Sequence, residues 1–305
     1  MVTGKHNLTV GSVLFTIFNY TLMILITIIC IYPFYYVLIN SISANELSAR
    51  GVVLFVPREV HFSNFTQVFN LPGLVRATFV SVSRTVVGTT LTVLASAFLG
   101  FLFTKHMWGR KFWYRLLIAS MYVQAGLVPY FIVLMRMGFM NSFWVYIIPA
   151  IVQPFSVLLV KTYVESTPIS LQESAEIDGA GPLKVFLHII LPLSKPILAT
   201  VAIFAAVGQW NAFMDTLIFN NADQSLWTLQ YILHQYIGNA SRLAAEIRAM
   251  GMGGGGIDHM RIAQMQTPTS VRMTVTVVVT LPILFVYPFF QRYFTKGLMM
   301  GAVKG

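Results

Sequence analysis

The charged residues of this chain leave six long stretches without a single Asp, Glu, Lys or Arg. Each stretch has at least 19 residues, and together they cover residues 7–45, 85–104, 116–135, 137–160, 196–214 and 273–291. A helix needs about 20 largely apolar residues to cross the hydrocarbon core of a bilayer, which is roughly 30 Å thick. Soluble helices average about 11–12 residues and keep a polar face. We therefore interpret the stretches as membrane spans rather than as buried helices of a soluble protein.

The composition favours the same class of protein. Charged residues make up 10% of the 305 residues, whereas average domains contain about 25%. We predict an all-α membrane protein with a single domain over residues 1–305 and six transmembrane helices. The spans are expected at about 12–39, 80–104, 115–135, 143–163, 197–219 and 271–291. The first is too long for the apolar region of a signal peptide, about 7–15 residues, so we expect it to remain as an anchor.

Basic residues in the short loops predict the orientation, because they concentrate on the cytoplasmic side. The loop at 105–115 carries four Lys or Arg residues, whereas the loop between the third and fourth spans carries only Arg136. Both termini and the segment 164–196 are therefore expected in the cytoplasm, and the long loops 40–78 and 220–270 outside. The net charge of +10 is spread over membrane edges, which argues against nucleic-acid binding.

Motifs for catalysis and metal binding are absent from the sequence. The chain has no phosphate-binding G-x-x-x-x-G-K-[ST], no His-Glu-x-x-His and no G-x-S-x-G. Its six histidines do not occur at ligand spacings, and Cys30 is its only cysteine. We therefore expect a non-catalytic chain with no metal and no cofactor.

The segment 164–196 has the pattern of two short helices joined by a bend. Pro168 and Ser170 suit the start of a helix, Gly179 suits its left-handed end, and Pro182 suits the first turn of the next helix. The second helix is expected to place four apolar residues on one face: Leu183, Phe186, Leu187 and Ile190. A rigid unit of this kind between two spans can pass on the motion of a soluble partner.

The same segment carries a spaced motif. The motif begins with Glu173, Ser174 and Ala175, and Gly179 follows after a gap of three residues. Ile189 follows after a gap of nine residues, and Leu191 and Pro192 after a gap of one. The motif resembles the cytoplasmic signature of the permease subunits of binding-protein-dependent ABC importers, from which only Ser174 departs. The resemblance implies the type I ABC importer permease fold. It assigns coupling to the ATPase to Glu173, Ser174, Ala175, Asp178, Gly179, Ala180, Ile189, Leu191 and Pro192.

Three further features resemble the carbohydrate branch of that family: the sequence at 175–180, the pair Trp210-Asn211, and the tail 301–305, which is similar to that of the maltose-type permease subunit. The implied partners are a second homologous permease subunit, a dimeric ABC ATPase, an extracellular solute-binding protein and a carbohydrate substrate. By the same resemblance, the glycine run 251–256 would touch the binding protein and the tail 296–305 would reach the ATPase. From composition alone, that glycine run is equally consistent with a loose surface loop.

Polar residues within spans are candidates for a substrate route, because they tend to face a cavity rather than lipid. The set on the fifth span is Gln209, Trp210, Asn211 and Asp215. These residues can bind a sugar, or they can bond to neighbouring helices instead. A secondary transporter or channel subunit would need charges at span centres, whereas Arg84 and Asp215 are expected near span ends. A purely structural membrane subunit is the third alternative.

Overall fold

The computed structural model describes residues 10–70, 73–123, 125–236, 238, 267 and 269–284. The regular structure in these ranges is helical, with no strand among them, as predicted. The chain divides into two compact units, which are described separately below. Unit 1 comprises Met1–Val68 and Tyr236–Val278, and unit 2 comprises Phe69–Gln235 and Val279–Gly305.

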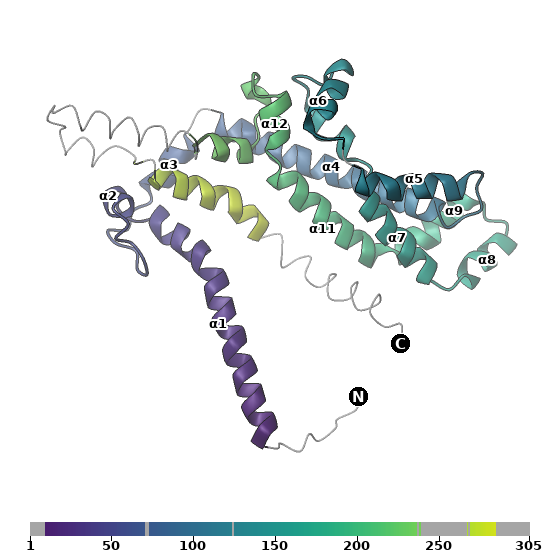
Figure 1. Cartoon of the computed structure of the whole chain (residues 1–305), viewed down its shortest axis with the longest axis horizontal. Helices are drawn as coiled ribbons and strands as arrows, with labels where there is room; N and C mark the ends of the chain where they lie inside the picture. Colours follow the sequence, from purple (N-terminus) through teal and green to yellow (C-terminus); the bar gives the residue numbers. More distant parts are fainter. Residues whose placement is uncertain are drawn as a thin grey trace. The chain divides into compact units, whose positions relative to one another are not determined.

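The longest helix of unit 1 is α1 (Val10–Ser41), with 32 residues (Figure 1). Its buried side chains are confined to the last three residues, Ile39, Asn40 and Ser41. A helix of this length measures about 48 Å, more than the hydrocarbon core of a bilayer. Exposed apolar side chains along such a helix fit a lipid environment.

The last turn of α1 is fixed by polar contacts to the segment that follows it. Asn40 Nδ2 donates to the Val53 carbonyl oxygen at 3.1 Å, and Asn40 Oδ1 accepts from Ser48 Oγ at 2.8 Å. This segment contains the short helices α2 (Asn45–Ala49) and α3 (Ser63–Phe69). The part of the expected loop that lies in unit 1 is therefore folded against the end of the first span.

Unit 2 holds a longer series of helices. In chain order they are α4 (Leu74–Leu102), α5 (Arg110–Tyr122), α6 (Leu127–Arg136), η1 (Phe143–Tyr146), η2 (Ile148–Ala150), α7 (Pro154–Ser166), α8 (Ser170–Ile177), α9 (Pro182–Val185), η3 (Phe186–Ile190), α10 (Leu191–Leu193), α11 (Lys195–Asn211), α12 (Met214–Phe219) and η4 (Gln224–Leu226). A further helix covers Thr269–Leu284, of which Thr269–Val278 belongs to unit 1 and Val279–Leu284 to unit 2.

The core of unit 2 lies where α4 packs against α7 and α11 (Figure 1). Ala97 of α4, Val160 of α7 and Val201 of α11 are buried there. Gly100 permits the close approach of α7, because a Cβ at this position would lie 2.7 Å from Val160 Cγ1 and 3.1 Å from the Lys161 backbone nitrogen. Contacts this short leave no room for a side chain at position 100.

Two described helices, α1 and α4, are long and apolar enough to cross a membrane alone, and up to four spans result if each of two bent pairs counts as one. The first pair joins Phe143–Ala150 to Pro154–Ser166 at 43°, and the second joins Pro182–Leu193 to Lys195–Asn211 at 78°. The expected sixth span, 271–291, begins within Thr269–Leu284 and extends beyond the described residues.

The expected third span, 115–135, is not one continuous helix. Helix α5 ends at Tyr122 and α6 begins at Leu127. Between them, Val123 is extended and Gly126 has a φ of 81°, which is incompatible with a right-handed helix. An absence of charge identifies an apolar stretch, but it carries no information on whether the helix is unbroken.

Candidate functional site

The bend between α8 and α9 is a Schellman motif, the hydrogen-bonded turn with which many helices end. The Ala180 backbone N–H donates to the Ala175 oxygen at 2.9 Å, and the Gly179 N–H donates to the Glu176 oxygen at 3.1 Å. Gly179 has a φ of 79°, the left-handed conformation that this motif requires. Helix α9 then begins at Pro182. The two helices and the bend predicted for this segment are confirmed.

The buried face of the second helix differs from the predicted one. Val185, Phe186 and Ile190 are buried, whereas Leu183 and Leu187 are 62% and 46% exposed. The reason is local: residues 186–190 form a π-helical turn. The wider turn breaks the 3.6-residue spacing on which the prediction was based.

The signature residues fall into two groups. Those packed against the core of unit 2 are Ala175, Ala180, Ile189 and Leu191. Those exposed on the surface are Glu173, Ser174, Asp178, Gly179 and Pro192. The motif therefore provides both an attachment to the core and an outward surface.

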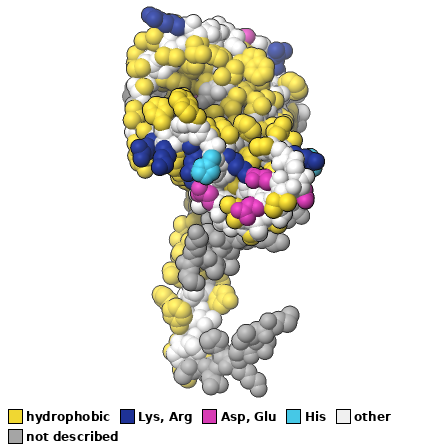
Figure 2. Space-filling model, turned by 90° about the vertical axis from the view of Figure 1, so that its right-hand side faces the viewer, with side chains coloured by type: hydrophobic (Ala, Val, Ile, Leu, Met, Phe, Trp, Pro, Cys, Tyr) yellow, Lys and Arg dark blue, Asp and Glu magenta, His cyan; other side chains and the backbone are white. Residues whose placement is uncertain are grey.

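The outward surface combines apolar and charged side chains. Ile177 and Ile169 are 86% and 67% exposed, and Glu173 and Asp178 are exposed beside them in the sequence. Figure 2, which faces this end of unit 2, shows acidic side chains next to Lys and Arg side chains. Exposed large apolar residues rimmed by polar ones are typical of a docking surface.

An ion pair also ties α8 to the segment that follows α4. Lys105 Nζ lies 2.7 Å from Glu176 Oε1, and the same ammonium lies 5.5 Å from the centroid of the Phe101 ring. This pair could not be predicted from the sequence, because its members are 71 residues apart and neither stands out locally.

A second polar centre surrounds Arg84, whose side chain is 2% exposed. Its guanidinium donates to Gln209 Oε1 at 3.0 Å, to the Ala212 carbonyl oxygen at 3.1 Å and to Asp215 Oδ2 at 2.7 Å. The guanidinium carbon also lies 4.4 Å from the centroid of the Tyr146 ring. Ala212 directly follows the last residue of α11, and Asp215 lies in the first turn of α12. Arg84 thus holds the break between these two helices.

Arg84 lies further from the start of its helix than the expected span implied. Helix α4 begins at Leu74 rather than near residue 80, so Arg84 lies ten residues into it, about 15 Å along the axis. The helix start could not be found from charge-free windows, because Arg76 and Arg84 interrupt residues 74–84. Each of the three guanidinium nitrogens of Arg84 nevertheless donates a hydrogen bond within the chain.

Two of the four predicted substrate-route residues are enclosed in unit 2. Gln209 is 5% exposed, accepts from Arg84 and donates to the Tyr146 carbonyl oxygen at 3.2 Å. Trp210 is 8% exposed, and its Nε1 donates to the Val279 carbonyl oxygen at 3.0 Å. Both polar groups are used to bond neighbouring segments.

The other two remain accessible. Asn211 is exposed, and its Oδ1 accepts from Gln230 Nε2 at 3.1 Å. The Asp215 side chain is 32% exposed on the far side of its ion pair with Arg84. Within the part of the chain that the structure describes, no group of three or more His, Cys, Asp or Glu residues could hold a metal ion. The glycine run 251–256 and the tail 296–305 lie outside the described residues.

Residues 92–300 match the protein family described as "Binding-protein-dependent transport system inner membrane component". The chain belongs to this family. Its match to "Polygalacturonan/rhamnogalacturonan transport system permease protein YtcP" of Bacillus subtilis (strain 168) is 31% identical and covers 96% of this chain and 99% of the relative. "Protein LplC" of the same organism is 34% identical over 98% of both chains. The resemblance inferred from the signature is confirmed.

The fold of this family member agrees with that of a solved transporter chain. It matches the "Crystal structure of a bacterial ABC transporter involved in the import of the acidic polysaccharide alginate" with a TM-score of 0.81. The match covers 94% of this chain and 99% of the other at 22% identity. The expected ABC importer permease fold therefore extends over nearly the whole molecule.

Proposed function

We propose that this chain is the permease subunit of an ABC importer for a sugar or oligosaccharide, and that it forms half of the translocation pathway. The relative YtcP, which is named as a polygalacturonan/rhamnogalacturonan transport system permease protein, supports a carbohydrate substrate. Motion from a separate, dimeric ATPase enters through α8 and α9. ATP is hydrolysed in that partner, since this sequence lacks a phosphate-binding loop.

The observation that carries this proposal is the two-sided construction of the α8–α9 unit. Val185, Phe186 and Ile190 lie in the same buried cluster as residues of α4, α7 and α11. On α8, Ile177 is 86% exposed. The Schellman bend at Gly179 fixes the angle between the two sides. A partner that grips the exposed side therefore moves the packed helices with it.

The remaining partners follow from the same function. A second homologous permease completes the pathway, and an extracellular solute-binding protein delivers the sugar. Both termini lie in the cytoplasm of the bacterial cell, as the basic residues at 105–115 indicate. In this proposal the run 251–256 contacts the binding protein and the tail 296–305 contacts the ATPase.

Asn211 and Asp215 are the residues of α11 and α12 through which this chain contacts its sugar. They combine an amide and a carboxylate with accessible surface, the groups that hydrogen-bond sugar hydroxyls. Arg84 fixes the position of the Asp215 carboxylate through a hydrogen bond of 2.7 Å.

The test compares two glycines in the assembled transporter. Gly179→Leu and Gly138→Leu each place a side chain at a φ of 79° with no atom within 4 Å of the new Cβ, so each strains the backbone by about 1–2 kcal/mol. Only Gly179 lies in the coupling bend. We expect Gly179→Leu to remove most of the ATP turnover that binding protein and sugar stimulate, while Gly138→Leu retains it.

Equal loss in both variants would show that backbone strain, and not coupling, is responsible. Copurification tests the function as a whole. An ATPase should copurify with the chain as a stable complex. Sugar uptake by the purified chain alone in vesicles, without an ATPase, would refute the proposal and favour a secondary transporter.

A further inference from the structure

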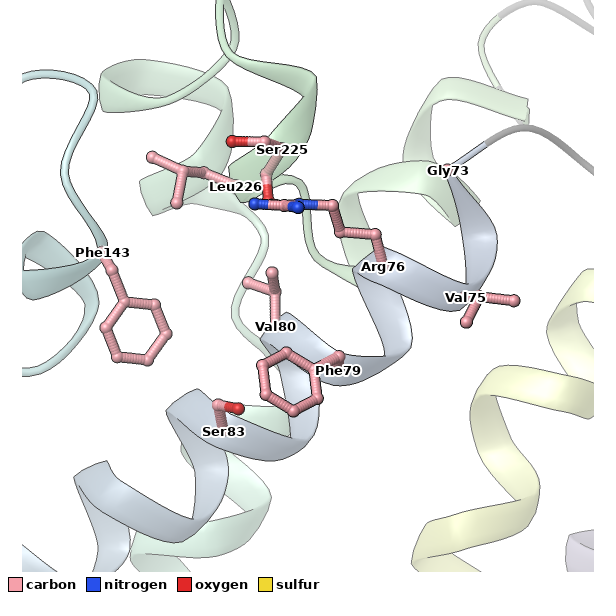
Figure 3. A pocket seen from close by; sticks show the side chains of 9 residues that line it. All are labelled: Gly73, Val75, Arg76, Phe79, Val80, Ser83, Phe143, Ser225 and Leu226. Carbon is pink, nitrogen blue, oxygen red and sulfur yellow. The ribbon is translucent and has the colours of Figure 1, made fainter.

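A cavity of about 860 Å³ lies at the N-terminal end of α4 and is not used by the function proposed above. Its walls come from α4, η1 and η4. Figure 3 shows Arg76 extending from α4 toward Ser225, and the Phe143 side chain reaching from η1 toward α4. All of these elements belong to unit 2.

The lining is largely apolar, with one cation at its edge. The apolar side chains are those of Val75, Phe79, Val80, Phe143 and Leu226. A sugar site needs several hydrogen-bonding groups for its hydroxyls, and apart from Arg76 the lining offers only two serines. The chemistry suits a ligand with a long apolar part and one anionic group.

The depth of the cavity in the membrane agrees with such a ligand. Helix α4 has 29 residues and measures about 43 Å, which equals a bilayer including both headgroup layers, about 40–45 Å. Arg76, in the first turn, therefore lies at headgroup depth. Phe79 and Val80 lie one turn deeper, toward the hydrocarbon. Val75 and Phe79 are 75% and 73% exposed, so the face of α4 that carries them is open to a ligand that approaches within the plane of the bilayer.

Arg76 retains hydrogen-bonding capacity for an anion. Its Nε donates to the Ser225 carbonyl oxygen at 2.9 Å, and no Asp or Glu of the described chain forms an ion pair with it. Asp223 is the nearby acid, but its Oδ1 accepts from the Ser225 N–H at 2.8 Å. Hydrogen bonds from Ser225, with a smaller contribution from the charge of Arg76, lower the pKa of Asp223.

We propose that this cavity binds an anionic phospholipid. The phosphate pairs with the free guanidinium nitrogens of Arg76, and one acyl chain lies along Phe79, Val80 and Phe143. The proposal requires membrane insertion, but it depends neither on a sugar substrate nor on an ATPase. Its failure would therefore not refute the function proposed above, and the failure of that function would not refute it.

The test titrates phosphatidylglycerol onto the assembled, delipidated transporter and counts bound lipid by native mass spectrometry. Arg76→Gln should weaken binding of the first phosphatidylglycerol about fivefold, the loss expected for one basic side chain near an anionic headgroup. Arg76→Lys should retain it. Arg136→Gln is the matched control, because this exposed arginine ends α6 outside the cavity.

A second variant tests the apolar part of the site without touching the charge. Ser83 lines the cavity, so Ser83→Trp should fill it and weaken phosphatidylglycerol binding while Arg76 is intact. Phosphatidylcholine should bind several-fold more weakly to the wild type, and inorganic phosphate should not displace the lipid.

Unchanged binding in Arg76→Gln or in Ser83→Trp would overturn the proposal. So would equal affinity for phosphatidylcholine, which indicates an apolar cleft without charge selection, or displacement by inorganic phosphate, which indicates a simple anion site. If the second permease covers the cavity, neither variant changes lipid binding, and the proposal is equally refuted.

Discussion

Replacing Arg84 by methionine should destabilise unit 2 strongly, because it removes the buried cation and leaves its hydrogen-bond acceptors in place. Three hydrogen bonds, at 3.0, 3.1 and 2.7 Å, are lost. Gln209 Oε1 and the Ala212 oxygen lose a donor, and Asp215 loses its counter-charge. Breaking a buried ion pair in this way costs about 3–5 kcal/mol. Since the Asp215 side chain is 32% exposed and can be hydrated, we expect a value of about 3 kcal/mol, at the lower end of that range.

The free energy of unfolding can be measured by SDS titration of the purified chain in mixed micelles. A loss of about 3 kcal/mol reduces the ratio of folded to unfolded protein more than a hundredfold. Arg50→Met is the control, because Arg50 forms an exposed i,i+4 pair with Glu46, a type of pair that contributes about 0.3–0.5 kcal/mol.

The double variant Arg84→Met/Asp215→Ala decides whether the pair itself matters. Removing both charges leaves no unpaired carboxylate, so the double variant should be at least as stable as Arg84→Met alone. Additive losses, or a loss below about 1 kcal/mol for Arg84→Met, would show that the guanidinium does not hold the α11–α12 break.

Two further predictions concern packing and the substrate route. Gly100→Ala should lower the melting temperature of the assembled transporter, because its Cβ would lie 2.7 Å from Val160 Cγ1 and overpacking costs about 1–3 kcal/mol. Adding Val160→Ala should restore only part of the loss, because the new Cβ would still lie 3.1 Å from the Lys161 backbone nitrogen. Asn211→Ala should raise the apparent KM for sugar uptake several-fold with basal ATP turnover intact. An unchanged KM would remove Asn211 from the route.

The two helices of segment 164–196 could be predicted from sequence because their signals are local. Pro168, Gly179 and Pro182 mark the ends of two helices within 15 residues, and each acts through its own backbone conformation. The family signature lies on the same short segment. The exposure of Leu183 and Leu187 could not be predicted, because it depends on a π-helical turn that no residue type specifies alone.

The Arg84 centre could not be predicted, because its members come together only through packing. Arg84 and Asp215 are 131 residues apart, and each was assigned to a span end from the nearest charge-free window. The same windows failed to predict the interruption before Gly126, since an apolar stretch can contain a helix break. Gln209 and Trp210 were chosen for their chemistry, and the structure engages both inside the chain.

A displacement of α8 can reach the other helices of unit 2 by two routes, and the ion pair between Lys105 and Glu176 provides one of them. One runs through the tightly packed residues of α9 and η3, and the other runs directly to the end of α4. The two routes differ in strength, because a half-exposed pair contributes at most about 1 kcal/mol and dissolved ions weaken it. Transmission through the first route is therefore insensitive to ionic strength, whereas any share carried by the second fades as salt is added.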